Sequence, residues 1–235
     1  MEEKVIGILG GMGPEATLDL FQKIIEFTDA SKDQDHLRVI IDSNPKIPDR
    51  TEAILGRGED PVPMMVRSVH ALERAGASFV VIPCVSAHFF LEELRSQVDT
   101  PILSIFDETA SYIIRNFPDL KTVGVLASTG TVRGGRFQKR LSESGLGIVV
   151  PTPNDQQKII SIIYRIKRLN ASQVCEEGKR VLIDVSHHLI QRGAQGIIAG
   201  CTELPLVLKS EDLSVPVFDV ESILARAAVT AAKSA

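Results

Sequence analysis

Two cysteines at matched positions are the residues of this sequence whose type and spacing could do chemistry. Cys84 and Cys201 lie 201 − 84 = 117 positions apart, and each follows a short apolar run of the kind found in buried strands. A thiolate can accept a proton and a thiol can donate one, so a cysteine can act as a general base or a general acid. Two such groups facing one carbon atom could take a proton from one side and return a proton to the other. That chemistry is racemisation or epimerisation.

Glycines share the spacing of the two cysteines. The differences 124 − 7, 130 − 13 and 193 − 76 all equal 117, and a glycine occupies each of these positions. One shift shared by four landmarks predicts two homologous halves, and 2 × 117 = 234 is close to the chain length of 235 residues. Each half then carries one cysteine at the carboxyl end of a strand. Cys175 has no partner at this shift, because position 58 is a glycine, and is expected to be structural.

The elements that must position the cysteines alternate between strands and helices. The first half is predicted to contain strands at 5–9, 37–41 and 79–82 and helices at 14–28 and from about 63 to 74, with a loop before the second helix. The second half repeats this plan, and matching final strands are expected at 101–105 and 215–218. This alternation predicts an α/β fold with parallel sheets flanked by helices. Ligands bind beyond the carboxyl ends of strands in such sheets, where both cysteines fall. A helix start after each cysteine is expected to lower the pKa of its thiol.

Composition excludes other classes of function. The chain has 26 basic and 30 acidic side chains and a net charge of −4, so it lacks the excess of positive charge that nucleic acid requires. No apolar stretch approaches the roughly 20 residues that span a bilayer, and the apolar run after the acidic start is too short for a signal peptide. The three cysteines form no CxxC motif and the histidines lack a spaced carboxylate set, so neither disulfides nor a metal site is expected. The expected location is the cytoplasm, with free thiols.

Four blocks of sequence together resemble the aspartate/glutamate racemase family. They are Gly-Gly-Met-Gly-Pro-Glu-Ala-Thr at 10–17, Ile-Pro-Asp-Arg-Thr at 47–51, Ile-Pro-Cys at 82–84 and Gly-Cys-Thr-Glu-Leu-Pro at 200–205. The first block resembles the aspartate racemase branch of the family. The resemblance spans nearly the whole chain.

The resemblance implies a cofactor-independent racemase of an acidic amino acid. It further implies two pseudo-twofold-related α/β domains, an active site in the interdomain cleft, and a homodimer. In this family the last strand of each domain and the C-terminal helix tend to cross over. The expected domains are therefore 1–100 with 215–235, and 101–214.

The resemblance also assigns roles to individual residues. Cys84 and Cys201 would be the two acid/base thiols, and Arg50 would bind a substrate carboxylate, which a guanidinium does in a bidentate manner. The other residues expected at the site are Gly11 and Met12 beside the substrate, Ser86, Thr129 and Thr202 as hydroxyl and amide donors, Asp49 and Lys167 as a charged pair near the thiols, and Glu203 to orient the substrate ammonium or the neighbouring thiol.

Val85 departs from the family pattern, which has Asn-Thr after the first cysteine. Valine has no amide to donate to a substrate carboxylate, whereas Ser86 keeps the hydroxyl of the next position. A relaxed or altered specificity is our hypothesis for this change. Aspartate and glutamate are not separated by the sequence, because one methylene is worth only about 1–3 kcal/mol in a pocket. His88, four residues after Cys84, is expected at a solvent-facing helix start.

Three other functions fit parts of the sequence. The pattern GxGxxA at 11–16, with Asp42 ending the next strand, is typical of dinucleotide binding. However, Pro14 removes an amide from the helix start, and 42 − 11 = 31 exceeds the usual spacing of about 20. A binding protein could instead close its two halves on a small ligand without chemistry. A related cysteine-dependent lyase or isomerase of a small diacid stays open because of Val85.

Overall fold

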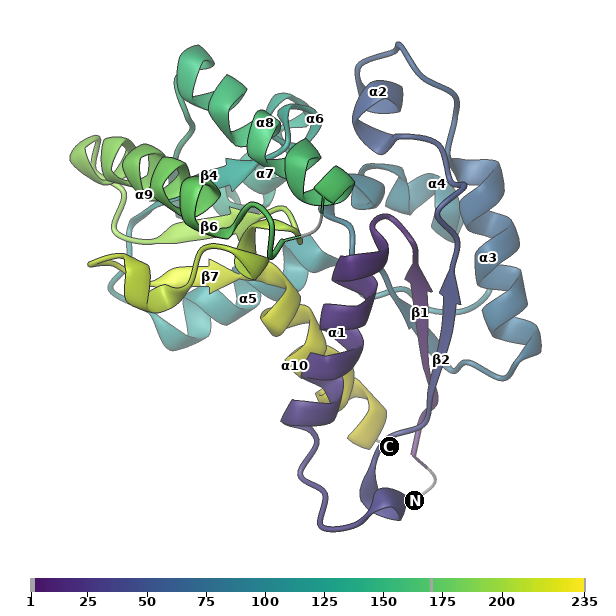
Figure 1. Cartoon of the computed structure of the whole chain (residues 1–235). Coiled ribbons are helices and arrows are strands. Elements are labelled where there is room, and N and C mark those ends of the chain that lie inside the picture. The colour runs from purple at the N-terminus through teal and green to yellow at the C-terminus, as the bar shows by residue number, and fades with distance from the viewer. Residues whose placement is uncertain (1–2, 170, 235) are drawn as a thin grey trace. The chain divides into compact units, whose positions relative to one another are not determined.

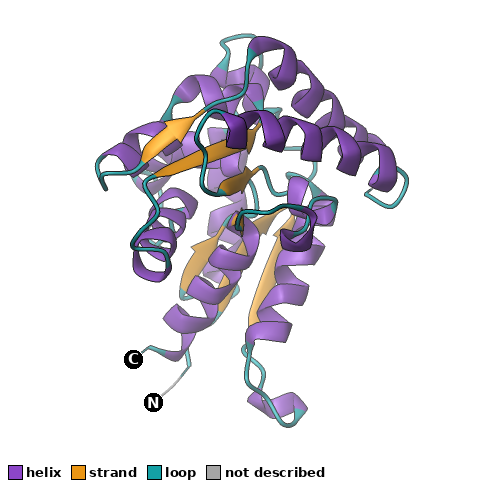
Figure 2. Cartoon of the chain, turned by 90° about the vertical axis from the view of Figure 1, so that its left-hand side faces the viewer, coloured by secondary structure: helices purple, strands orange, loops and turns teal. Residues whose placement is uncertain are grey.

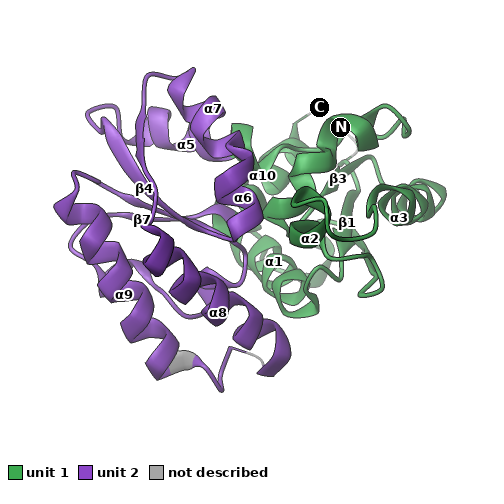
Figure 3. Cartoon of the chain, turned by 90° about the horizontal axis from the view of Figure 1, so that it is seen from above, with its two compact units in different colours: residues 1–108, 221–235 green, residues 109–220 purple. Residues whose placement is uncertain are grey.

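The computed structural model describes residues 3–169 and 171–234, with the side chain of Cys175 left out. The chain alternates strands and helices (Figure 1) and forms two compact units, Met1–Glu108 with Glu221–Ala235, and Thr109–Val220 (Figure 3). In each unit, helices flank a parallel sheet (Figure 2), which confirms the predicted α/β class. Among the described residues, no helix combines the length and the apolar character that a membrane crossing needs.

The sheet of the first unit has β1 at its centre. Its order is β2-β1-β3 and all pairs are parallel, with β1 at Ile6–Gly10, β2 at Val39–Ser43 and β3 at Phe79–Val81. All five residues of β1 are buried, because a parallel sheet is covered on both faces. This explains why the strand has an unbroken apolar sequence in place of an alternating one. The first three predicted strands are confirmed, with ends that differ by at most two residues.

Helices of the first unit begin where the sequence supplies a start signal. The predicted helices are α1 (Pro14–Phe27) and α3 (Val62–Arg74), and Pro14 begins α1 because the first turn needs no amide donor. The segment before α3, predicted as a loop, also contains the short helix α2 (Arg50–Ile54). The other helical segments that begin in or belong to this unit are the 3₁₀ segments Asp33–Asp35 and Val85–Phe90 and the helices α4 (Leu91–Arg95), α5 (Ile105–Asn116) and α10 (Val220–Lys233).

The second unit contains a four-stranded parallel sheet of order β5-β4-β6-β7. Its strands are β4 (Thr122–Ala127), β5 (Gly147–Val149), β6 (Ile197–Gly200) and β7 (Val217–Asp219). Its helices are α6 (Thr129–Gly134), α7 (Arg136–Ser142), α8 (Pro153–Leu169) and α9 (Cys175–Gln191), with short 3₁₀ turns at Leu204–Leu206 and Ser210–Asp212. The apolar faces of α8 and α9 pack with β4 and β6 into one buried core.

Backbone pairing repeats between the two units with the shift found in the sequence. In the first sheet Gly7 is the register partner of Val80, and in the second Gly124 is the partner of Ile197. The differences 124 − 7 and 197 − 80 both equal 117. The glycines suit this place because an added Cβ would lie 2.9 Å from Ala77 Cβ in the first sheet and 2.8 Å from the Ile197 side chain in the second. The repeated sequence therefore builds the same central strand pair twice.

The turns before β3 and β6 and the positions after them are also matched. Gly76 and Gly193 have φ values of 95° and 96°, the left-handed region that favours glycine at the end of a helix. After the strands, the carbonyls of Cys84 and Cys201 each accept a hydrogen bond from the amide three residues later, at 3.1 and 2.9 Å. The two cysteines therefore occupy equivalent backbone positions in two similar units.

The final strand of each half stays within its own unit. Ile102 forms an isolated parallel bridge with Val80, and β7 pairs with β6. The predicted strand at 101–105 is shorter than expected because the Ser104 hydroxyl accepts a hydrogen bond from the Asp107 amide at 3.2 Å and so begins α5. The expectation that these strands cross over is wrong.

The C-terminal helix α10 does return to the first unit. The amide of Lys4 donates a hydrogen bond to the carbonyl of Ala232 at 3.0 Å. The helix is therefore the element that closes the first unit, after β7 has completed the second sheet. The assignment of 1–100 with 215–235, and of 101–214, to two domains stays a prediction.

Candidate active site

Cys84 lies at the carboxyl end of β3, at the strand end that the sequence predicted. Its backbone is extended, with φ −159° and ψ 105°, and the 3₁₀ segment Val85–Phe90 follows. The residue is 5% exposed and packs in the hydrophobic core of the first unit. Val85 and Ser86 are also buried, at 2% and 9% exposure. The position that departs from the family pattern is therefore a packed side chain next to the cysteine.

His88 is buried behind Cys84, although the sequence interpretation placed it in solvent. Its ring is 2% exposed and stands edge-on to the ring of Phe106, with the ring centroids 6.0 Å apart. Nδ1 lies 3.0 Å from the Cys84 carbonyl oxygen, and Nε2 lies 3.3 Å from the Leu103 carbonyl oxygen. The imidazole thus lies between the backbone of the cysteine and the segment that bridges to β3. We infer that it positions this backbone.

The buried imidazole makes folding sensitive to acid. Burial lowers the pKa of His88 from 6.5 to about 4. Between these two pH values the imidazole is protonated in the unfolded chain but stays neutral in the folded chain. Stability from this group is complete above pH 6.5 and is lost as the pH falls toward 4. We expect wild-type protein to lose roughly 2–3 kcal/mol more than His88→Gln between pH 7 and pH 4.5 in urea unfolding. Equal losses in the two proteins would contradict this account.

Arg50 joins the two loops that carry the first two family blocks. Its Nη1 donates hydrogen bonds to the carbonyls of Ile47 and Pro48, at 2.9 and 2.7 Å, and its Nη2 donates to the carbonyl of Met12 at 3.1 Å. The Nε atom is buried and has no hydrogen-bond partner among the residues that the structure describes. In this arrangement the guanidinium holds the shape of the loops. Its predicted contact with a substrate carboxylate stays a prediction.

Gly11 and Met12 shape the loop after β1. Gly11 has φ +88°, and its amide donates to the Thr17 hydroxyl at 2.8 Å, so this donor is already used within the loop. The Met12 side chain is 1% exposed and belongs to the core. The carbonyl of Met12 accepts the hydrogen bond from Arg50, and the predicted place of Met12 beside the substrate stays a prediction.

Asp49 begins the helix α2. Its Oδ1 accepts hydrogen bonds from the amides of Thr51 and Glu52 at 2.7 and 3.0 Å, which is N-cap geometry. This cap explains why a helix forms in a segment that the sequence predicted as a loop. The role as a member of a charged pair, which the resemblance implied, stays a prediction.

Cys201 lies at the carboxyl end of β6 and contacts a buried carboxylate. The residue is 8% exposed, and its Sγ donates a hydrogen bond to Glu203 Oε2 at 2.9 Å. The other oxygen of Glu203, Oε1, forms an ion pair with Nζ of Lys167 on α8. The Glu203 side chain is 3% exposed and that of Lys167 is 27% exposed. Thiol, carboxylate and ammonium thus form a chain from the core toward the surface.

These neighbours shift the pKa of the Cys201 thiol in the direction opposite to the predicted one. Burial and the charge of the Glu203 carboxylate raise the pKa of Cys201 well above its usual value, and Lys167 offsets part of this effect. The predicted lowering by a helix start is therefore wrong for Cys201. The segment that follows is only the three-residue turn Leu204–Leu206, whose dipole is small beside a carboxylate in direct contact.

Threonines near the strand ends of the second unit have local partners. Thr129 begins α6 and lies 3.5 Å from Gln156 Nε2, which also donates to the Ala127 carbonyl at 2.8 Å. Thr202 is 1% exposed, and its hydroxyl lies 3.5 Å from Glu203 Oε2. Gln156 was not predicted from the sequence, and its Oε1 is buried without a hydrogen-bond partner in the described part of the chain.

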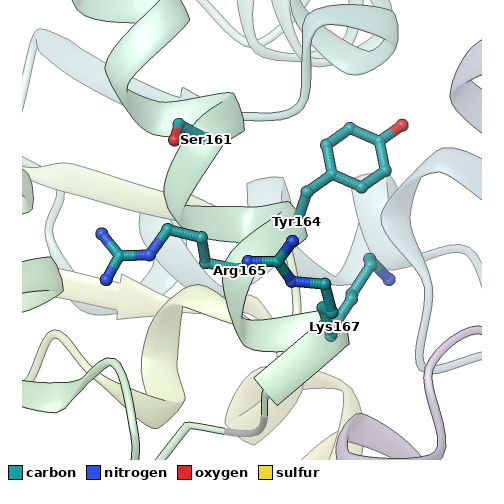
Figure 4. Close-up of a pocket in the computed structure, with 5 residues that line it drawn as sticks. Ser161, Tyr164, Arg165 and Lys167 are labelled. Carbon is teal, nitrogen blue, oxygen red and sulfur yellow. The ribbon is translucent and has the colours of Figure 1, made fainter.

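A pocket of about 600 Å³ opens along α8 beside Lys167 (Figure 4). It is lined by Ser161, Tyr164, Arg165, Lys167 and Arg168. Arg165 also pairs with Glu177 at 2.7 Å. The pocket is rich in cationic side chains, and Lys167 connects it to Glu203. Within residues 3–169 and 171–234, no cluster of three or more His, Cys, Asp or Glu side chains is placed to hold a metal ion.

The structure gathers the predicted residues into two groups, one in each unit. Gly11, Met12, Asp49 and Arg50 meet around the loops of the first unit, and Thr202, Glu203 and Lys167 meet at Cys201 in the second. The link from Lys167 to Glu203 was not predicted from the sequence. The sequence contains one signal that Lys167 belongs to the site. Because 167 − 50 = 117, Lys167 occupies the repeat position of Arg50.

Comparison with known proteins shows the family of the chain. The family model described as Asp/Glu/Hydantoin racemase matches residues 9–228. The chain is similar to the broad specificity amino-acid racemase RacX of Bacillus subtilis (strain 168), with 30% identity over 230 residues that cover 96% of this chain and 97% of that protein. It is also similar to the structure of Picrophilus torridus aspartate racemase, with a TM-score of 0.87 and 29% identity over 97% of this chain and 94% of that one. An aspartate racemase homologue from Pyrococcus horikoshii OT3 has a TM-score of 0.78 and 28% identity over 99% of this chain and 100% of that one. The chain therefore belongs to the Asp/Glu/Hydantoin racemase family and is an amino-acid racemase.

Proposed function

We propose that this racemase acts on an acidic amino acid, aspartate or glutamate, by a two-base reaction of Cys84 and Cys201 without a cofactor. The observation that carries the proposal is the equivalence of the two cysteines. Each follows a strand that pairs in parallel with the central strand β1 or with its counterpart β4, and the carbonyl of each accepts the same backbone hydrogen bond at positions 117 apart, since 201 − 84 = 117. In the reaction one thiolate takes the α-proton, which leaves the electron pair on the carbon. The other thiol then donates its proton to the opposite face.

Cationic groups favour a substrate with two carboxylates. Arg50 has a buried Nε that is not engaged by the described residues, and its bidentate geometry suits a carboxylate. In the second unit Arg165, Lys167 and Arg168 line one pocket, which favours the approach of an anion. The relative from Picrophilus torridus is an aspartate racemase, and the relative from Bacillus subtilis is a broad specificity amino-acid racemase. The first relative supports an acidic substrate, and the second supports the relaxed substrate specificity that we proposed from Val85.

The remaining residues support the substrate in this proposal. The hydroxyls and amides at Ser86, Thr129 and Thr202 would bind the α-carboxylate and the amine, and Glu203 would act mainly on the Cys201 thiol. Gly11, Met12 and Asp49 would hold the loops that carry Arg50. We also propose that the protein is a cytoplasmic homodimer. Light scattering of the purified protein measures its molar mass and so tests the dimer.

Incubation in deuterium oxide tests the function. L-Aspartate and L-glutamate are offered separately to the purified protein, together with a panel of neutral amino acids. We expect the D-enantiomer to form from an acidic substrate with deuterium at the α-carbon, measured by chiral chromatography and proton NMR. A broad product profile would support relaxed specificity. The absence of α-exchange with every acidic amino acid would contradict the proposal.

Val85 keeps one related alternative open. Because the buried valine replaces a side-chain amide, a cysteine-dependent lyase or isomerase of a small diacid could use the same thiols. Incubation with small diacids, followed by NMR for a changed carbon skeleton or double-bond geometry, would detect that activity. Such products in the absence of amino-acid racemisation would favour the alternative.

A further inference from the structure

The two cysteines occupy equivalent backbone positions but have different neighbours. Two residues after Cys201 stands Glu203, whereas the matched position two residues after Cys84 is Ser86, since 203 − 86 = 117. A carboxylate therefore accompanies one thiol, and a neutral hydroxyl stands at the same place beside the other. The repeat that relates the two cysteines is therefore broken at the residue two positions after each of them.

The contact at Cys201 defines where the proton lies. The Glu203 carboxylate forms an ion pair with the ammonium of Lys167, and a carboxylate in an ion pair can only accept hydrogen bonds. The Sγ of Cys201 lies 2.9 Å from Oε2 of that carboxylate. The hydrogen between them must therefore belong to sulfur. A thiolate here would place two anions in contact inside a site where both side chains are nearly inaccessible to water.

We infer that Cys201 is the protonated member of the pair before substrate binds, and that Cys84 acts first as the base. The inference rests on the proposed two-cysteine reaction. Glu203 is then a positioning residue, which keeps the proton on Cys201, and Lys167 holds the Glu203 carboxylate in place through their ion pair. The charged groups that act on the Cys201 thiol are Glu203 and Lys167.

The first half-reaction follows from this assignment. The Cys84 thiolate forms an S–H bond with the α-proton of the enantiomer that presents its hydrogen to Cys84. The S–H bond of Cys201 breaks as its proton passes to the opposite face of the carbon. The product leaves Cys84 as a thiol and Cys201 as a thiolate beside Glu203. Proton exchange with water must then restore the resting form, or the opposite enantiomer must bind.

Thiol labelling without substrate tests the inference. Iodoacetamide, which reacts with thiolates, is applied across a range of pH values, and the alkylation of each cysteine is followed by peptide mass spectrometry. We compare the pH at which the labelling rate of each thiol is half its maximum. A difference in reagent access to the two buried thiols changes the labelling rates but not these midpoints. We expect the midpoint of Cys84 to lie at least one pH unit below that of Cys201, a tenfold difference in thiolate fraction.

Two variants with opposite expected effects separate electrostatics from misfolding. In Glu203→Gln the negative charge is lost at constant shape, so the Cys201 midpoint should fall by at least one pH unit. In Lys167→Met the offsetting positive charge is lost, so the Cys201 midpoint should rise. The Cys84 midpoint should stay constant in both, and circular dichroism checks the fold.

Several outcomes would overturn the inference. These are equal midpoints in the wild-type protein, a lower midpoint for Cys201 than for Cys84, or shifts of Cys201 in the same direction in the two variants. The labelling requires no turnover, so it can fail while racemisation is observed. It can also succeed if the chain turns out to catalyse a different reaction.

Discussion

Replacing Cys84 or Cys201 by serine is expected to lower the racemisation rate by about 10²–10⁴-fold, the usual contribution of a positioned acid or base. Serine keeps the size and hydrogen-bonding capacity of the side chain, but its hydroxyl is a far weaker acid than a thiol. Each variant removes one of the two proton carriers that the reaction needs. The rate with each enantiomer is measured by circular dichroism or chiral chromatography.

The two serine variants should differ in the exchange that survives. Cys201→Ser retains Cys84 as a base, so it should still exchange the α-hydrogen of one enantiomer with deuterium while the product is not inverted. Cys175→Ser is the matched control, because Cys175 has no partner at the repeat shift of 117, where position 58 is Gly58. It should racemise at the wild-type rate. A near wild-type rate in either Cys84→Ser or Cys201→Ser would remove that cysteine from the mechanism.

Gly11→Ala is expected to cause the largest loss of stability among single glycine substitutions in the first unit. The residue has φ +88°, and an added Cβ would lie 2.3 Å from the carbonyl carbon of Asn44. The left-handed backbone costs about 1–2 kcal/mol for a residue with a side chain, and forcing two packed segments apart costs about 1–3 kcal/mol. The expected loss is therefore about 2–5 kcal/mol in the free energy of unfolding, measured in urea.

A second glycine with similar backbone geometry supplies the control for this prediction. Gly193 has φ +96°, and an added Cβ would meet nothing within 4 Å. Gly193→Ala therefore carries only the backbone cost, about 1–2 kcal/mol. If Gly11→Ala is no more destabilising than Gly193→Ala, the close approach of the loop after β1 to Asn44 does not constrain the fold.

Local pattern was enough to predict most of the scaffold. The unbroken apolar sequence of β1 reflects burial on both faces, and Pro14 marks the start of α1 because its ring suits a first helical turn. The repeat of glycines at 117 positions predicted two similar halves. The prediction succeeded because close strand packing and left-handed turns exclude larger side chains at these places.

Other elements depended on contacts that spacing alone does not specify. The helix α2 forms because Asp49 accepts two amide hydrogen bonds, in a segment whose prolines and charges resemble a loop. The segment 101–105 forms one bridge in place of a strand, because Ser104 caps the following helix. Local competition between a cap and a strand is decided by small energy differences, which the pattern of apolar residues does not encode.

By itself the sequence determined that this chain has two similar α/β halves, with one cysteine at the carboxyl end of a strand in each. Tertiary structure decided which charged groups contact the Cys201 thiol. Glu203 and Lys167 are 36 positions apart, and they meet because α8 and the end of β6 pack in one unit. His88 likewise became a buried group between two carbonyls, not a solvated helix start. The pKa of a group depends on burial and on charges within a few ångströms, and these are set by chain crossovers and not by spacing along the sequence.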